Sequence, residues 1–176
     1  MNKARELSHI AMFAALLALC AWIAVPTAVP VTLQTLGVFL AGGLLGGRKA
    51  TAAVGLYILM AAAGLPVLAG FRGGAGALLG STGGYVLGFL LITLTMWAAE
   101  KLPVRSLPVR AAAMTAGLAL CYAFGTAWFM AVYARGGGAA AARTVLGWCV
   151  APFVLPDLGK IAAALWLTER LKRHIR

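Results

Sequence analysis

Charged residues in this sequence are confined almost entirely to the ends of long apolar segments. The first of these segments, Leu7–Val25, follows Lys3 and Arg5 and contains no acidic residue, lysine or arginine. Several more apolar segments of the same character follow it. Because the hydrocarbon core of a bilayer excludes charge and a helix needs about 20 apolar residues to cross it, this arrangement predicts a protein that crosses a membrane repeatedly.

The composition argues against a soluble fold for this chain. Of the 176 residues, 62% are hydrophobic and only 11% are charged, and the mean hydropathy is +0.94. A soluble domain has about 45–50% apolar and about 25% charged residues. The segment Leu7–Val25 resembles a signal peptide, but further apolar segments follow it and no small-residue cleavage site precedes a soluble region, so we expect a retained helix. We therefore expect one membrane domain over residues 1–176.

The apolar segments and their Pro and Gly boundaries predict six transmembrane helices in one compact all-α bundle. The second and third are short for a bilayer crossing, since the core of the second has 11 residues. The sixth contains Pro152 and Pro156, which we expect to interrupt it. The expected helices are Leu7–Val25, Leu36–Gly46, Ala50–Ala63, Gly83–Ala99, Arg110–Tyr133 and Arg143–Leu171.

Membrane topology explains the formal net charge of +11 better than a nucleic-acid partner does. Six helices place both termini on one side, and eleven of the fifteen Lys and Arg residues share that side. Arg72, Arg135 and Arg143 lie on the other side, and Lys160 lies within an apolar segment. This bias predicts a multi-pass protein of the cell membrane with cytoplasmic termini and basic residues at the lipid headgroups. No basic stripe with interleaved aromatic residues indicates nucleic-acid binding.

Two irregular stretches fall on the outer side in this topology, Pro26–Thr35 and the Gly-rich Leu65–Gly84. Unpaired backbone groups are costly in lipid, so non-helical chain at membrane depth must be buried in protein or line a cavity. The two stretches therefore predict a pocket that opens outward and is roofed by loops.

Asp157 and Lys160 are the two charges that lie well inside an apolar segment. Their i, i+3 spacing places them on one helix face, and a charge at the bilayer centre normally faces a partner or a cavity. One interpretation is an internal ion pair that fixes helix packing. The other is a binding site, in which the carboxylate accepts from ligand N–H groups and the ammonium donates to a ligand carbonyl or carboxylate.

The Gly-rich segment Gly70–Tyr85 contains neither a P-loop nor a G-x-G-x-x-G pattern, so it is not a nucleotide-binding loop. Gly83 and Gly84 open a predicted helix, whose free N–H groups and positive dipole end suit an anionic or carbonyl-bearing ligand. Close packing is the alternative, because Gly84 and Gly88 also form a small-residue motif. Both interpretations stay open at this point.

Polar residues alternate with apolar ones in Pro30–Thr35. Gln34 has both donors and an acceptor, and Thr32 and Thr35 add hydroxyls, so this run is a further candidate for ligand contact. The first predicted helix carries a small-residue face that suits close contact, either within the bundle or with a partner. This face consists of Ala11, Ala14, Ala15 and Ala18.

Cysteine and histidine spacing predicts no metal site. Cys20, Cys121 and Cys149 lie within apolar segments and form no CxxC pair, so we expect buried free thiols. His9 and His174 lie at opposite ends of the chain.

Five motifs follow one another along the chain: Val29–Gly42, Gly64–Phe71, Ser81–Phe89, Gly125–Trp128 and Pro152–Lys160. Together they cover nearly the whole chain and resemble the signature of the BioY family, the biotin-binding S components of energy-coupling-factor (ECF) transporters. Ser81 stands where the family pattern usually has Pro. The resemblance implies a six-helix S component that captures biotin from outside for ATP-driven import.

The resemblance also implies partners and a site. The implied partners are a transmembrane T component and two cytoplasmic ABC ATPases, which use ATP. The T component is expected to contact small residues on the first helix, above all Ala14 and Ala18. The resemblance implies no cofactor for this chain. In the implied site, Asp157 accepts the ureido N–H groups, aromatic residues hold the apolar body, and a cation or helix N-terminus takes the carboxylate. The candidate substrate-binding residues are Gln34, Thr35, Phe71, Arg72, Gly83, Gly84, Tyr85, Trp128, Asp157 and Lys160.

Other functions remain as alternatives. An S component for another vitamin would have the same general architecture, and a proton-coupled exporter could use Asp157 as its proton carrier. An intramembrane enzyme would need a nucleophile with a base or a metal cluster, and the sequence offers no convincing arrangement of either kind, so we expect no enzymatic activity.

Overall fold

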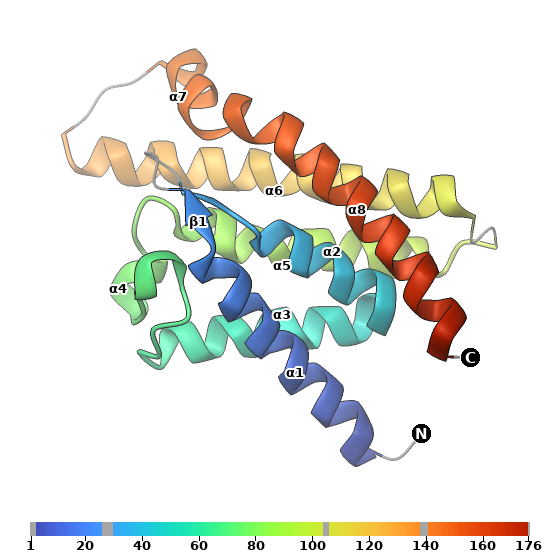
Figure 1. Cartoon of the computed structure of the whole chain (residues 1–176). Helices are drawn as coiled ribbons and strands as arrows, with labels where there is room; N and C mark the ends of the chain where they lie inside the picture. Colours follow the sequence, from blue (N-terminus) through green and yellow to red (C-terminus); the bar gives the residue numbers. More distant parts are fainter. Residues whose placement is uncertain (1–2, 26–29, 104–105, 138–140, 176) are drawn as a thin grey trace.

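Long helices form most of the computed structural model, which describes residues 3–25, 30–103, 106–137 and 141–175, without the side chains of 173–175 (Figure 1). Each of the six predicted segments contains a long helix. These helices are α1 (Lys3–Trp22), α2 (Gln34–Leu45), α3 (Gly47–Ala62), α5 (Gly83–Ala99), α6 (Leu107–Arg135) and α8 (Ala151–Ile175). The predicted helical class is therefore confirmed.

Length and hydropathy support membrane insertion for part of this bundle. Among the described residues, α1 and α6 are long and apolar enough to cross a membrane. The short helix α7 (Ala142–Cys149) and α8 add a third span if they form one broken crossing, bent by 41°. The helices α2 and α5 are apolar but shorter. The membrane class is therefore supported, and six crossings stay a prediction.

The break between α7 and α8 lies at Val150, where φ is −125° and ψ is −53°. The expected interruption near Pro152 is therefore present, whereas the expected interruption at Pro156 is wrong. Pro152 lies in the first turn of α8, where a backbone N–H has no intrahelical acceptor and its loss costs little. Pro156 lies one turn later, and α8 continues through it.

Loops, short helices and a hairpin form one end of the bundle, the left end in Figure 1. The strands β1 (Ala24–Val25) and β2 (Val31–Thr32) pair antiparallel between α1 and α2. Residues 26–29 of the predicted irregular stretch lie outside the described residues. The Gly-rich stretch is not wholly irregular, since it contains η1 (Ala69–Phe71) and α4 (Ala75–Leu78).

The helices α5 and α6 approach each other closely through glycine. A Cβ added at Gly84 would clash with Trp128, and one added at Gly88 would meet the Cys121 sulfur atom at 2.7 Å. Two glycines of α6 face α5 in the same way: Gly117 and Gly125. Small residues allow such contact where lipid gives no hydrophobic drive for helix association, so close packing is confirmed as the role of Gly84 and Gly88.

The small-residue face of α1 is divided between the core and the surface. Ala14 is 0% exposed and Ala18 is 5% exposed, and both belong to the main core cluster. Ala11 and Ala15 are exposed. The assignment of Ala14 and Ala18 to a partner interface is therefore corrected, because their side chains are already covered within this chain.

The start of α1 and the end of α8 lie at the end of the bundle opposite the hairpin (Figure 1). The α2–α3 and α5–α6 connections lie at that same end, at Gly46 and between residues 99 and 107. The two ends of the molecule thus differ: one carries both termini and short connections, and the other carries the loops that surround the candidate site.

Candidate functional site

A cavity lies at the loop end of the bundle, between α2, α5, α6 and α8, with a volume of about 80 Å³. Its lining contains polar residues, called here the polar wall, and apolar residues, called here the apolar wall. The polar wall includes Thr32, Gln34, Thr35, Arg72, Thr82, Tyr85, Tyr122, Asp157 and Lys160. The apolar wall includes Leu68, Ala77, Val86, Phe89 and Phe153. A mainly apolar cleft with a few convergent polar groups is the usual form of a small-molecule site.

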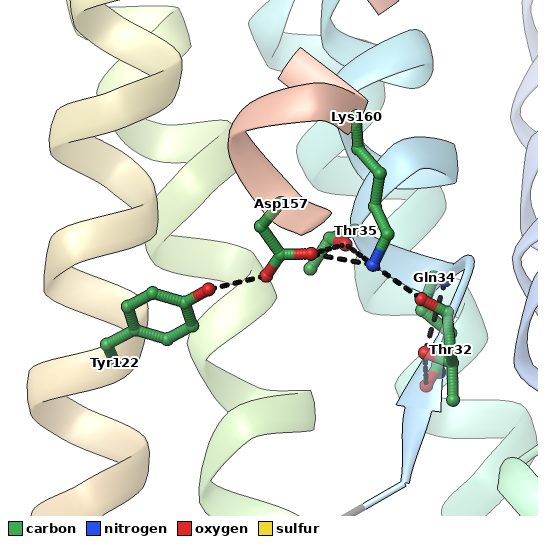
Figure 2. Close-up of polar contacts among 6 residues, drawn as sticks. All are labelled: Thr32, Gln34, Thr35, Tyr122, Asp157 and Lys160. Carbon is green, nitrogen blue, oxygen red and sulfur yellow. Dashed lines mark hydrogen bonds and ion pairs between the residues drawn. The ribbon is translucent and has the colours of Figure 1, made fainter. Parts of the chain in front are cut away.

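Asp157 is the centre of the polar wall and is only 1% exposed. Its Oδ1 atom accepts hydrogen bonds from Lys160 Nζ at 2.6 Å and from Thr35 Oγ1 at 2.8 Å, and its Oδ2 atom accepts one from Tyr122 OH at 2.6 Å (Figure 2). These donors come from α8, α2 and α6, so the carboxylate joins three helices. Three donors to one buried carboxylate compensate much of the cost of removing its charge from water.

Lys160 supplies the opposite charge. Its Nζ atom donates to Asp157, to the backbone oxygen of Thr32 at 2.7 Å and to Thr35 Oγ1 at 3.1 Å. The side chains of the pair are 11% exposed for Lys160 and 2% for Asp157, so the ion pair is largely shielded from water but still reached from the cavity. The structure thus confirms the i, i+3 pair on one helix face.

Gln34 is fixed by its neighbours on α3 and β2. Its Nε2 atom donates to Tyr57 OH at 2.7 Å, and its Oε1 atom accepts from Thr32 Oγ1 at 3.1 Å. Tyr57 OH in turn donates to the backbone oxygen of Val67 at 2.9 Å. The amide is therefore buried and oriented, and it connects the start of α2 to the loop that precedes η1.

Two further predicted residues reach the cavity. Tyr85 lines it from α5, and its hydroxyl lies 3.0 Å from Thr126 Oγ1. Arg72 lines it from the loop after η1, is exposed to solvent, and donates from Nε to Ala69 O at 3.2 Å. The Arg72 guanidinium is therefore a cation that lines the cavity and is also exposed to solvent.

Phe71 and Trp128 are not among the residues that line the cavity, so their expected contact with an apolar ligand stays a prediction. Phe71 is 63% exposed and stacks on Trp22 with 4.8 Å between ring centroids. Trp128 packs on Gly84 and donates from Nε1 to Gly80 O at 3.0 Å. Both aromatic rings therefore stabilise the surrounding loops.

Gly83 and Gly84, the first two residues of α5, are also not among the residues that line the cavity. The Gly83 N–H already donates to Gly80 O at 3.1 Å, and a Cβ at this position would overlap the backbone oxygen of Leu78. The Gly83 N–H is therefore already used within the chain, and contact of a ligand with the Gly84 N–H stays a prediction.

Sequence reasoning missed several residues of the site. Tyr122 donates to Asp157 Oδ2 at 2.6 Å, yet nothing in its local sequence separates it from other tyrosines of the chain. Cys121 and Cys149 line the cavity as buried free thiols, so the prediction of buried thiols is confirmed for them, but their place in the cavity was not foreseen. Phe153 was noted only within a motif, and it supplies part of the apolar wall.

A bundle of apolar helices with a buried charge pair in a cavity at one end defines a helical membrane protein with a site for a small polar ligand. Such a site can bind by hydrogen bonds and shape, since it presents acceptors, donors and an apolar wall. The BioY family model matches residues 1–176, and the chain belongs to the BioY family.

Relatives and a solved structure match nearly the whole chain. The "Biotin transporter BioY" of Thermotoga maritima is 38% identical over 172 residues, covering 96% of each protein. The "Probable biotin transporter BioY" of Pyrococcus horikoshii is 37% identical over 171 residues, covering 97% of this chain and 98% of that protein. A solved structure described as the "S-component for biotin from an ECF-type ABC transporter" superposes with a TM-score of 0.85 at 26% identity, covering 98% of this chain and 95% of that one.

Proposed function

We propose that this chain captures biotin as the membrane-embedded S component of an ECF transporter and that Asp157 and Lys160 are the centre of its binding site. The observation that carries the proposal is the buried, hydrogen-bonded charge pair in the wall of a partly apolar cavity. Support also comes from the relatives named as biotin transporters and from the solved S component for biotin.

The chemistry of biotin suits the two walls of the cavity. Its ureido ring has two N–H donors and one carbonyl, and a carboxylate such as that of Asp157 offers about four acceptor positions, of which three are used here. One ureido N–H takes the remaining position. The ureido carbonyl accepts from Lys160 in place of one of its present acceptors, of which Thr35 Oγ1 is the most distant at 3.1 Å.

The rest of the ligand then extends along the apolar wall toward solvent. The thiophane ring and valeryl chain lie against Tyr85, Val86 and Phe153, which line the cavity together. The carboxylate tail pairs with Arg72, the cation of the cavity wall that is exposed to solvent. This orientation places the charged end of biotin at the entrance, where water still solvates it.

The proposed topology has six crossings, with both termini in the cytoplasm and the cavity facing outward in the cell membrane. The excess of Lys and Arg on the side of the termini supports it. Further support comes from the arrangement of both termini and the short connections at the end opposite the cavity (Figure 1). The shorter α2 and α5 contribute to the bundle by packing against their longer neighbours.

The proposed assembly contains a transmembrane T component and two ABC ATPases, which use ATP while this chain binds only the vitamin. On α1, the exposed alanines Ala11 and Ala15 form the small surface that is left for a T component. The proposal therefore moves the partner interface from the buried to the exposed side of this helix.

A binding panel tests the function. We expect the purified chain to bind biotin and not thiamine or riboflavin when each is titrated in detergent. Preference for another vitamin would assign the same architecture to a different substrate. Uptake into vesicles separates the exporter alternative, because an ECF complex needs ATP, whereas an exporter that uses Asp157 as its proton carrier would respond to a proton gradient and move biotin outward.

A further inference from the structure

A series of hydrogen bonds leads from the cavity into the core of the bundle through Gln34. This residue lies at the start of α2 and lines the cavity, and its Nε2 atom donates to Tyr57 OH at 2.7 Å. Tyr57 lies on α3, is 0% exposed, and is not among the residues that line the cavity. Its hydroxyl donates in turn to the backbone oxygen of Val67 at 2.9 Å. A side chain outside the cavity therefore holds one that lines it.

The Val67 carbonyl sets the direction of the hydrogen bonds in this series. A carbonyl oxygen only accepts, so the single hydroxyl proton of Tyr57 is used on Val67, and the Tyr57 oxygen accepts from Gln34. The two ends of an amide differ, because the nitrogen donates and the oxygen accepts. The Gln34 nitrogen must therefore face Tyr57, and the Gln34 oxygen must point the other way.

The loop around Val67 is itself held in place. The backbone oxygen of Pro66 accepts from Trp22 Nε1 at 2.9 Å. The Leu68 N–H donates to the backbone oxygen of Arg72 at 2.9 Å. Val67 lies between these two contacts and is 6% exposed. Because the last acceptor of the series is fixed, the amide at its other end has one preferred orientation.

The oxygen end of the Gln34 amide faces Thr32, which lines the cavity. Its Oε1 atom accepts from Thr32 Oγ1 at 3.1 Å, and Thr32 Oγ1 in turn accepts the backbone N–H of Gln34 at 3.2 Å. An amide oxygen has two acceptor positions, and Thr32 occupies one of them. Within the described part of the chain, the second acceptor position of Gln34 is therefore left for a ligand.

The polar wall then presents an acceptor, a donor and an acceptor in that order (Figure 2). Lys160 Nζ is the middle group, because it donates to Asp157 Oδ1 at 2.6 Å and to Thr32 O at 2.7 Å. Thr32 in turn contacts the Gln34 oxygen. The ureido ring of biotin has the complementary order, with a carbonyl between two N–H donors. The proposed function assigns one N–H to Asp157 and the carbonyl to Lys160, so the second N–H is left for Gln34.

We propose that Tyr57 is a positioning residue for biotin, because its hydroxyl turns the Gln34 oxygen toward the cavity to accept the second ureido N–H. This inference rests on the proposed function and extends it to a residue that does not touch the ligand. Without the hydroxyl, the Gln34 nitrogen loses its acceptor, and an unsatisfied buried donor is costly. The amide then rotates and turns its nitrogen, a donor, toward the donor N–H of biotin.

A mutant cycle tests the proposal by isothermal titration of biotin into the full chain in detergent. Tyr57→Phe keeps the ring and should weaken biotin binding by about 3- to 10-fold, the value of one neutral hydrogen bond. Gln34→Met removes the amide at similar length and should weaken binding by a similar or larger factor. In the chain with both replacements, Tyr57→Phe should weaken binding by less than about a further twofold, because the amide through which Tyr57 acts is gone.

Tyr133→Phe is the matched control, since Tyr133 stacks on Phe129 and is not among the residues that line the cavity. Its affinity for biotin should match that of the parent chain. A purely structural role of Tyr57 in holding the loop at Val67 would give losses that multiply in the double variant. That result, or parental affinity in a folded Tyr57→Phe chain, would overturn the proposal and leave the proposed function intact. A parent chain that binds no biotin would instead contradict the proposed function.

A second measurement needs no change at Tyr57. Biotin methylated on one ureido nitrogen cannot donate from that nitrogen, and the two isomers block the two donors in turn. For one isomer, the ratio of its Kd to that of biotin should be at least about threefold smaller in the Gln34→Met chain than in the parent chain, because the acceptor of that N–H is already removed. Equal ratios in the two chains for both isomers would overturn the proposal.

Discussion

Replacement of Asp157 by asparagine should weaken biotin binding by at least about tenfold. The carboxylate accepts three hydrogen bonds, two of them at 2.6 Å, and offers only acceptors. The amide keeps the shape but replaces one oxygen by a donor, which then faces either Tyr122, Lys160 or a ureido N–H. A hydrogen bond to a charged group contributes about 1.5–3 kcal/mol, and each 1.4 kcal/mol is a factor of ten in Kd, so the loss of one ligand bond corresponds to about 10- to 150-fold.

The same replacement also affects stability, and the two effects must be separated. Lys160 is left largely buried without its counter-charge, and breaking a buried pair in this way costs about 3–5 kcal/mol. Biotin affinity is therefore measured by isothermal titration on protein that elutes as a single species and melts cooperatively. An Asp157→Asn chain that folds and binds biotin with parental affinity would refute the reasoning, because the carboxylate would then make no energetically important contact with the ligand.

Three further predictions concern the site, the helix packing and the topology. Tyr122→Phe should weaken biotin binding by about 3- to 10-fold in the same titration, because Asp157 loses one of its three partners; parental affinity would show that this hydroxyl does not position the carboxylate. Gly88→Leu should lower the free energy of unfolding by about 1–3 kcal/mol or more, seen as a lower melting temperature, since the added side chain must enter the α5–α6 contact; an unchanged melting temperature would contradict that contact. A cysteine at Gly74 should react with an impermeant maleimide on intact cells, and one at Ser106 should not; the reverse pattern would invert the proposed topology.

The helices were largely predictable because their signals are local. The segment Gly83–Ala99 is predicted and observed with the same bounds, since glycines open it and Glu100 follows it. The end of the bundle near the cavity was less predictable. The break at Val150 lies two residues before Pro152, where a proline favours the start of a new helix, but the second proline gave a misleading signal because α8 continues through Pro156.

The site was predictable where a residue violates the membrane pattern. Asp157 and Lys160 stand out as charges inside an apolar segment, and the structure brings them together with Thr35. Tyr122 could not be selected in this way, because its contact with Asp157 depends on how α6 and α8 cross. A chain with four tyrosines offers no local signal for which hydroxyl reaches the carboxylate.

Small-residue motifs indicated close contact but not its direction. Ala14 and Ala18 pack inward, although the family resemblance assigned them to a partner. On an alanine-rich helix such as α1, small residues occur on more than one face, so spacing alone does not say which face meets the bundle. The aromatic ring of Phe71 shows the same limit, since it stacks outside the cavity.

The most direct test of the proposed site is biotin affinity in the double variant Asp157→Leu with Lys160→Met. Replacing both members of a buried ion pair by apolar residues is often tolerated, so the double variant should fold better than either single variant. If the pair holds the ureido ring, isothermal titration will detect no biotin binding by this folded protein. Parental biotin affinity in a cooperatively melting double variant would contradict the account and leave the pair with a purely structural role.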